Sequence, residues 1–180
     1  FNDVSFSYDG YETVLDHVSF QIKKGERVAI IGKNGAGKTT AATLICGLHQ
    51  PSSGSISING KNISAFSVKE IGEMVSYVMQ NPNQMLVKDI IKDEVALALE
   101  LRGMSQEEIE ERVKEALETC RLYRMRNWPV DSISYGQKKR VTVAAMMALK
   151  PDILILDEPT RGIDVGAKYE IYCIINDLVA

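Results

Sequence analysis

A glycine-rich segment at residues 32–39, which ends in Lys38 and Thr39, restricts the fold more than any other feature of the sequence. The segment fits the pattern G-x-x-x-x-G-K-[ST], with an apolar run before it at 28–31 and a helical pattern after it that reaches Gly47. Glycines allow a backbone to wrap an anion with its N–H groups pointing inward, and the next helix N-terminus adds partial positive charge. We therefore predict a phosphate-binding loop between a buried strand and a helix.

The polar residues of this loop suit a triphosphate with its magnesium ion. Lys38 is a point charge for the β- and γ-phosphate oxygens, the Thr39 hydroxyl can ligate Mg²⁺, and Thr40 is expected to donate near the α-phosphate. The remaining predicted contacts come from the loop itself, at Gly32, Asn34, Gly35, Ala36 and Gly37.

A pair of acids follows a second apolar run. Residues 153–156 are aliphatic and lead directly into Asp157 and Glu158. Such a run is typical of a strand buried on both faces, and its acids then lie at the carboxyl edge of the sheet, where the phosphate loop also lies. We expect Asp157 to hold Mg²⁺, directly or through water, and Glu158 to act as the general base on an attacking water.

Short strands are expected in the first part of the chain. Segments with strand character lie at 4–8, 18–22, 55–60 and 75–79. The third of them ends in an Asn-Gly turn. Together with the two apolar runs, these segments predict an α/β fold with short antiparallel strands at the N-terminal end.

Helical patterns follow from about residue 89 to 121. Ser105 and Glu108 have the spacing of a capping box. The residues after them place apolar side chains on one helical face, at Ile109, Val113, Ala116, Leu117 and Cys120. We expect one more helix after Ser134 and a last helix from near Gly166 to the end of the chain.

Residues 132–140, with the sequence Ser-Ile-Ser-Tyr-Gly-Gln-Lys-Lys-Arg, resemble the signature of ABC ATPases, usually read as Leu-Ser-Gly-Gly-Gln. The other markers occur in the order of that family. Gln80 resembles the Q-loop glutamine, 162–164 resembles the D-loop and contains Asp164, and Tyr8 resembles the aromatic residue that stacks on adenine. The resemblance covers essentially the whole chain.

The resemblance implies a P-loop NTPase with a RecA-like core sheet, a small antiparallel β subdomain and an inserted α-helical subdomain, truncated at its C-terminus. The expected parts are a nucleotide-binding β/α lobe at 1–80, the helical subdomain at 81–135, and a final segment at 136–180. That final segment contains the signature helix, the Walker B strand, the D-loop and the helix after it.

The resemblance also implies how the site works. In the family, two ATP molecules lie between head-to-tail domains, and the signature of one domain reaches the ATP of the other. Here Ser134, Gly136 and Gln137 occupy those positions, while Gln80 is expected to touch Mg²⁺ or the attacking water. Tyr135 departs from the usual first glycine. We expect Lys138 and Lys139 to be solvated helix charges.

Two branches of bacterial importers share features with the chain. Residues 80–84 and 134–140 resemble the ATPases of energy-coupling-factor importers for vitamins and metal ions, whereas 158–168 is similar to sugar-importer ATPases. We favour the coupling-factor branch, with the ATPase at the cytoplasmic face of the membrane. Its expected partners are integral membrane subunits and an identical or related ATPase domain. A non-hydrolysing ATP-binding module is the alternative, which Glu158 disfavours.

Composition excludes other classes. A net charge of −3 argues against a general nucleic-acid binder and disfavours an ABC ATPase that acts on ribosomes. ABC ATPases that act on chromosomes have a long coiled coil between their two halves, whereas only about 95 residues separate Lys38 from Ser134 here. The longest apolar runs fall short of the roughly 18 residues that span a bilayer. Three separated cysteines suggest reduced, buried thiols. The chain begins with Phe1, and the family's γ-phosphate histidine is expected beyond Ala180, so we expect a piece of a longer protein.

Overall fold

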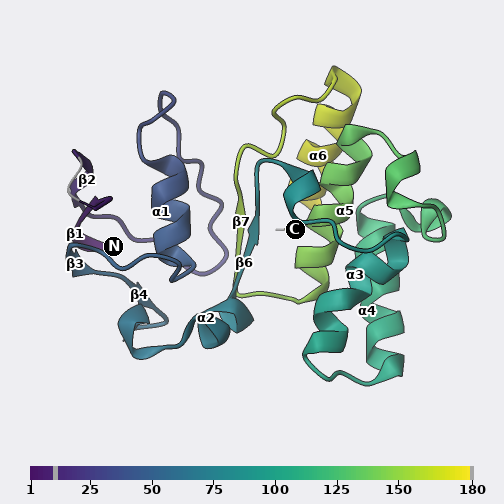
Figure 1. The fold of residues 1–180 in the computed structure, drawn as a ribbon, viewed down its shortest axis with the longest axis horizontal. Helices are drawn as coiled ribbons and strands as arrows, with labels where there is room; N and C mark the ends of the chain where they lie inside the picture. Colours follow the sequence, from purple (N-terminus) through teal and green to yellow (C-terminus); the bar gives the residue numbers. More distant parts are fainter. Residues whose placement is uncertain (10–11, 179–180) are drawn as a thin grey trace. The chain divides into compact units, whose positions relative to one another are not determined.

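The computed structural model describes residues 1–9 and 12–178. The chain divides into two compact units, Phe1–Val75 and Ser76–Ala180 (Figure 1). The division falls within β6 (Val75–Val78), just before Gln80. The finer division into parts at 1–80, 81–135 and 136–180 stays a prediction.

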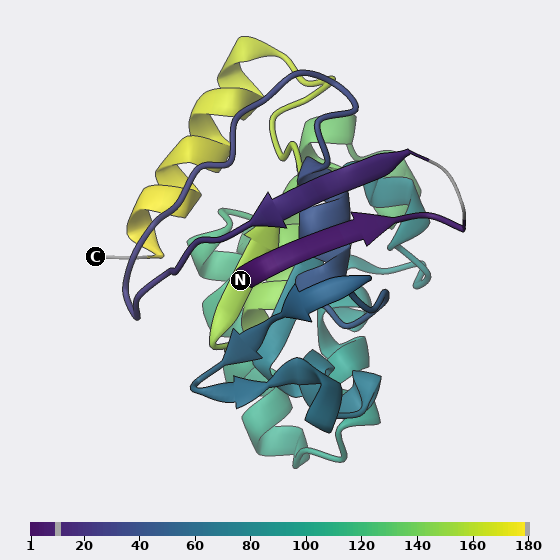
Figure 2. The same ribbon diagram turned by 90° about the vertical axis from the view of Figure 1, so that its left-hand side faces the viewer.

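The first unit contains a three-stranded antiparallel sheet with the order β2-β1-β3. Its strands are β1 (Asn2–Ser7), β2 (Thr13–Val18) and β3 (Ser53–Ser55). Figure 2 shows β1 and β2 side by side, with helix α1 (Lys38–Ile45) behind them. The sheet therefore has one face covered by the helix that follows the phosphate loop.

A small hairpin completes the first unit. Strands β4 (Ser57–Ile58) and β5 (Lys61–Asn62) are joined by Asn59 and Gly60, both with positive φ, at 50° and 76°. Positive φ at both central residues is the geometry of a type I′ turn, which confirms the turn predicted from the Asn-Gly pair. A short helix α2 (Val68–Met74) follows, after the 3₁₀ turn Ile63–Ala65.

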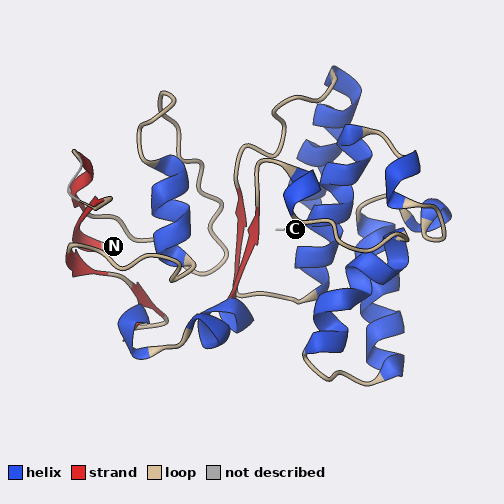
Figure 3. Ribbon diagram, viewed as in Figure 1, coloured by secondary structure: helices blue, strands red, loops and turns tan. Residues whose placement is uncertain are grey.

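Two strand predictions in this unit are wrong. The second strand lies at Thr13–Val18 and not at 18–22, because that register places Leu15 opposite the buried Phe6 of β1. The run at 28–31 is a loop and not a strand (Figure 3). Its Ile31 is 92% exposed. An apolar run favours burial, but a strand also needs a backbone partner. Among the described residues, 28–31 pairs with no strand.

In its described residues, the second unit combines a two-stranded sheet with four helices. Strand β7 (Ile153–Leu156) pairs with β6. The helices are α3 (Ile91–Leu101), α4 (Gln106–Thr119), α5 (Tyr135–Ala148) and α6 (Val165–Asp177), with 3₁₀ turns at Pro82–Gln84, Tyr123–Met125 and Val130–Ser132. Strand β7 is only partly buried along its whole length, so the prediction of a fully buried strand there is wrong.

The core of this unit lies where α3, α4 and α5 pack together. The predicted apolar face of α4 is buried, and fully buried residues from the other two helices meet it, among them Leu99 and Val141. Ser105 and Glu108 form the predicted capping box at the start of α4. The last helix ends at Asp177, and the predicted continuation to residues 179–180 lies outside the described residues.

Cys120 is buried as predicted, whereas Cys46 and Cys173 are only partly buried, so the prediction of buried thiols is wrong for those two. Cys46, Cys120 and Cys173 are all free. Burial raises the pKa of Cys46 to about 11 and that of Cys120 to about 12, so both stay protonated at neutral pH. Among the described residues, no helix combines the length and the apolar character needed to cross a membrane.

Candidate active site

The phosphate loop has the backbone shape that its glycines predict. Gly35 and Gly37 have φ of 81° and 82°, in the left-handed region, and Gly37 is the N-cap of α1. A Cβ at Gly37 would come within 2.7 Å of a methyl carbon of Leu15, whereas one at Gly35 would meet nothing within 4 Å. Gly37 is therefore required where the loop packs on β2, and the loop at Gly35 opens to free space.

Lys38 closes this loop on itself. Its ammonium donates to the carbonyl oxygens of Gly32 and Lys33, each at 3.0 Å. Asn34 and Ala36 lie on the exposed part of the loop between these residues, and Thr39 follows on α1, also exposed. The ammonium thus bridges carbonyl groups of the glycine-rich loop, and it can exchange these carbonyl partners for phosphate oxygens.

The structure brings the predicted adenine-stacking residue next to α1. The hydroxyls of Tyr8 and Thr40 are 3.1 Å apart, and Thr40 is buried. The ring of Tyr8 lies edge-to-face with those of Phe6 and His49, and 40% of the residue is exposed. Tyr8 therefore has an accessible ring tied to the helix that begins at the phosphate loop.

In the second unit, Asp157 is held at the end of β7 from two directions. Its backbone N–H donates to the carbonyl of Val78 at 3.0 Å, and its Oδ2 accepts from the Tyr77 hydroxyl at 2.9 Å. Tyr77 was not predicted from the sequence. Its one signal is that it lies in the strand that leads to Gln80. The hydroxyl orients a carboxylate that can serve as a metal ligand.

Glu158 lies at the centre of a group of polar contacts. Its Oε2 accepts from the Gln80 side-chain amide at 2.7 Å and from the Arg161 guanidinium at 2.9 Å. Its backbone φ is 44°, which is rare for a residue with a side chain. The predicted base and the predicted Q-loop glutamine are thus in direct contact, and Arg161 is a partner that sequence reasoning missed.

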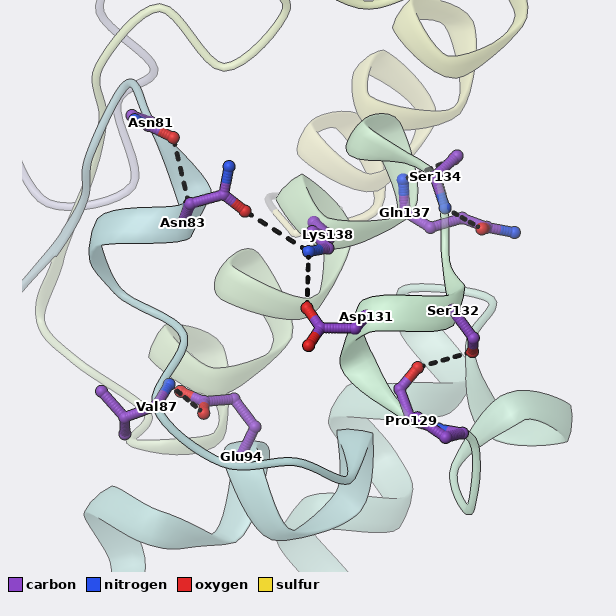
Figure 4. A network of polar contacts seen from close by, with 10 residues as sticks. All are labelled: Asn81, Asn83, Val87, Glu94, Pro129, Asp131, Ser132, Ser134, Gln137 and Lys138. Carbon is purple, nitrogen blue, oxygen red and sulfur yellow. Dashed lines mark hydrogen bonds and ion pairs between the residues drawn. The ribbon is translucent and has the colours of Figure 1, made fainter.

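The expectation that Lys138 and Lys139 are solvated is wrong. Lys139 is 3% exposed, and its ammonium donates to the Glu158 carbonyl at 3.0 Å and lies over the Tyr135 ring. Burial lowers the pKa of Lys139, and the nearby charge of Glu158 partly opposes this. Lys138 bonds to Asp131 at 3.1 Å and to Asn83 at 3.5 Å (Figure 4). Helical position alone could not reveal these partners, because they come from other segments.

The signature segment begins α5 with a complete capping box. The Ser134 hydroxyl accepts from the Gln137 N–H at 3.2 Å, and the Gln137 side-chain oxygen accepts from the Ser134 N–H at 2.8 Å. A hydroxyl can accept and donate together, so the cap does not consume the proton that a phosphate oxygen needs. A Cβ at Gly136 would lie 2.7 Å from that of Ala167, so packing against α6 also requires this glycine.

Asp164 has a structural partner. It is the N-cap of α6, and its Oδ1 accepts from the Ala167 N–H at 3.0 Å, which holds the pKa of Asp164 below its usual value. Beside it, an open cleft of about 410 Å³ is lined by residues from the Q-loop, signature and D-loop segments, namely Gln80, Asn81, Tyr135, Arg161 and Gly162.

The predicted site residues thus fall into two groups. The first unit holds Tyr8 and the phosphate loop through Thr40, and the second unit holds Gln80, Asp157, Glu158, Asp164 and the signature residues. Direct contacts join Tyr8 to Thr40 in the first group and Gln80 to Glu158 in the second.

Comparison with known proteins identifies the family. The model of the family described as ABC transporter matches residues 15–161. The chain belongs to the ABC transporter family.

Several relatives carry the same domain. A Clostridium perfringens protein named as an ABC transporter ATP-binding protein is 51% identical over 95% of this chain and 30% of its own length. A similarly named Enterococcus faecalis protein is 50% identical over 97% of this chain and 31% of its own length. The chain therefore spans less than a third of these curated relatives.

Solved structures of ABC ATPases share the fold. CbiO1 of Clostridium perfringens, described as part of the ABC transporter complex CbiONQ, matches with a TM-score of 0.92 at 30% identity, over 99% of this chain and 72% of that one. An ATP-binding cassette in a dimeric post-hydrolysis state, bound to ADP and phosphate, matches with a TM-score of 0.85 at 28% identity, over 99% and 81%. The predicted ABC ATPase fold is confirmed, and ATP with Mg²⁺ is the ligand pair that ABC ATPases use.

Proposed function

We propose that this domain binds Mg-ATP and hydrolyses it when a second ABC ATPase domain, identical or related, completes the site. In this proposal the ATPase lies at the cytoplasmic face of the membrane and drives an importer through integral membrane subunits. The observation that carries the proposal is the Glu158 carboxylate held by Gln80, directly beside Asp157 at the end of β7.

The first step is binding of the triphosphate. Lys38 and the inward N–H groups of the loop contact the β- and γ-phosphates, and Tyr8 offers its ring to the adenine. The donors fit this task, because Lys38 already bridges two carbonyl oxygens across the loop and Gly35 leaves open space there. Thr39, Gln80 and Asp157 would hold Mg²⁺, which neutralises charge on the phosphate oxygens when bound.

The second step is attack by water on the γ-phosphorus. Glu158 accepts a proton from the water while the bond from the γ-phosphorus to the β–γ bridging oxygen breaks, which releases ADP and phosphate. The Gln80 amide, 2.7 Å from the same carboxylate, can orient the water. In the structure Gln80 and Arg161 both donate to Oε2 of this carboxylate, so a water that binds at Oε2 would compete with these donors.

Completion of the site by a second domain has two supports. The Ser134 cap keeps a hydroxyl proton at the N-terminus of α5, where a phosphate of the neighbouring domain's ATP would be favoured. The related cassette bound to ADP and phosphate is a dimer. Because the acidic chain has no basic surplus, nucleic acid is not a proposed partner.

The importer branch rests on the similarity to CbiO1 and on residues 80–84 and 134–140. These favour an energy-coupling-factor ATPase for a vitamin or a metal ion. The sugar-importer branch keeps the support of residues 158–168. Co-purification of the full-length protein with an integral membrane subunit, and not with ribosomes, is the expected result for either branch.

The test of hydrolysis is Glu158→Gln in the full-length protein with its membrane partners. We expect turnover to fall by about 10²–10⁴-fold, because a general base contributes on that order, while Mg-ATP affinity is retained. Glu111→Gln, at an exposed position of α4, is the matched control and should keep wild-type turnover. Unchanged turnover in Glu158→Gln would remove the assignment of the base.

A further inference from the structure

We propose that Lys139 is a positioning residue for ATP hydrolysis, which holds the strained backbone of Glu158 so that its carboxylate stays beside Gln80. Lys139 touches neither substrate nor metal in this proposal, and it acts only through Glu158. The inference rests on the proposed function, because it takes Glu158 as the general base.

The first support is the unusual burial of a lysine. Three consecutive cationic residues begin the second turn of α5, and each contacts a different partner in the second unit. Lys138 reaches Asp131, Arg140 pairs with Glu170 at 3.3 Å, and Lys139 turns toward the acid pair with only 3% of its surface exposed. A buried ammonium is costly unless it has polar partners, and here its partner is the Glu158 carbonyl at 3.0 Å.

The second support is the place where the ammonium bonds. It donates to the backbone carbonyl of Glu158 at 3.0 Å. Glu158 has a φ of 44°, and a left-handed conformation of a residue with a side chain persists only where its surroundings enforce it. Because the direction of the side chain follows from the backbone angles, a contact that fixes the carbonyl also aims the carboxylate.

The third support is that the partners of Glu158 contact different parts of the residue, some its carboxylate and one its main chain. Gln80 and Arg161 both bond to its carboxylate oxygen Oε2, and an attacking water that binds there would compete with these two donors. The bond from Lys139 is to the main chain, so it can persist while the carboxylate changes partners. Lys139 therefore provides a fixed point for the base during turnover.

The primary test is Lys139→Met in the full-length protein with its membrane partners. Methionine keeps the length of the side chain and removes the donor. We expect kcat to fall by about 10–100-fold, since a misplacement of about 1 Å can cost on the order of 10²-fold, with KM for ATP and the affinity for Mg-ATP unchanged. Lys139→Gln keeps an N–H donor and should restore kcat to within about threefold of wild type, as expected for one rescued hydrogen bond.

Lys114→Met removes the same charge from an exposed position of α4 and is the matched control. If Lys139→Met fails to fold, Lys139→Asn takes its place. Asparagine carries the same amide group as glutamine, but its side chain is too short to reach the Glu158 carbonyl. Equal kcat in the Asn and Gln variants, or wild-type kcat in Lys139→Met, would overturn the inference.

Double mutants separate this inference from the proposed function. In the Glu158→Gln background, Lys139→Met should cause no further loss of turnover, because a residue that acts only through the base has nothing left to position. An undiminished further loss would show that Lys139 acts independently of Glu158. If Glu158→Gln itself left turnover unchanged, the proposed function would fail. If Glu158→Gln lowered turnover and Lys139→Met did not, only the role of Lys139 would fail.

Discussion

Two lysines of this domain, Lys38 and Lys139, lie in opposite surroundings. Lys38 follows the exposed phosphate loop, and it donates to carbonyls only 5 and 6 residues before it in the sequence. Lys139 is buried, and it donates to a carbonyl 19 residues further along the chain. The first lysine is placed by a local motif, whereas the second is placed by the packing of α5 against the end of β7.

The same contrast separates the two groups of site residues. The phosphate loop is contiguous, so its backbone shape depends on a few neighbouring glycines. In the second unit, Tyr77 meets Asp157 across 80 positions of sequence and Gln80 meets Glu158 across 78. Binding is therefore expected to depend on local geometry, and hydrolysis on tertiary contacts that a change elsewhere in the unit can disturb.

The largest effect that tests this contrast is expected for Lys38→Ala in the full-length protein with its partners. We expect Mg-ATP affinity and turnover each to fall by about 10²–10³-fold, since loss of one well-placed donor to a reacting group costs on that order. Lys139→Met, in contrast, should lower turnover alone. Nucleotide titration followed by phosphate release measures both quantities on the same sample.

The control for that comparison is Lys24→Ala, which removes an exposed lysine of the same unit. It should bind and hydrolyse ATP as the wild type does. If Lys38→Ala kept its affinity for Mg-ATP, the division of the two lysines into binding and positioning roles would be wrong.

A smaller effect is expected for Tyr77→Phe, which removes the hydroxyl that bonds to Asp157 at 2.9 Å. We expect the Mg²⁺ concentration for half-maximal turnover to rise by about 10-fold, because partners that orient a metal ligand typically contribute 10–100-fold to metal affinity. Turnover at saturating Mg²⁺ should change little. Tyr172→Phe, on the exposed side of α6, is the matched control, and an equal shift in both variants would exclude a role for the Tyr77 hydroxyl.

Whether a feature could be predicted from the sequence depends on how far apart its contacting residues lie in the sequence. The helix after the glycine-rich loop, the capping box at Ser105 and the apolar face of α4 were predicted correctly, because each depends on residues within a few positions of one another. Spacing alone could not predict the contact of Gln80 with Glu158, because 78 positions separate the two residues. Only the resemblance to ABC ATPases places both residues in one site.

The errors share one cause, which is that tertiary partners do not appear in local patterns. The run at 28–31 has the composition of a buried strand, yet among the described residues it pairs with no strand. Lys139 is a charged residue in a polar stretch of a helix, which suggests a solvated side chain, yet its neighbours in space are the two acids after β7. The sequence around Tyr77 gives no sign of its hydrogen bond, since the partner follows another strand.

The smallest effect concerns stability, and it compares matched capping boxes in the two units. Ser67 caps α2 in the first unit with Glu70, and Ser105 caps α4 in the second unit with Glu108. Replacing either serine by alanine should cost about 1 kcal/mol, the usual contribution of a side-chain N-cap. If the units open separately, amide hydrogen exchange should accelerate by roughly fivefold only in the unit that carries the change.

The stability that these two capping boxes contribute should also depend on pH, and the direction of the change can be predicted. Hydrogen bonds from Ser105 lower the pKa of Glu108, and hydrogen bonds from Ser67 lower that of Glu70. A carboxyl group with a lowered pKa stabilises the folded state above its unfolded pKa, and it loses that contribution as the pH falls through its folded pKa. The cost of Ser105→Ala should therefore shrink between about pH 6 and pH 3, and that of Ser67→Ala should shrink with it. If the exchange rate of a serine variant kept the same ratio to the wild-type rate across this pH range, the glutamate of that helix would not contribute to its cap. Glu111→Gln, outside both boxes, serves as the reference for general effects of acid on stability.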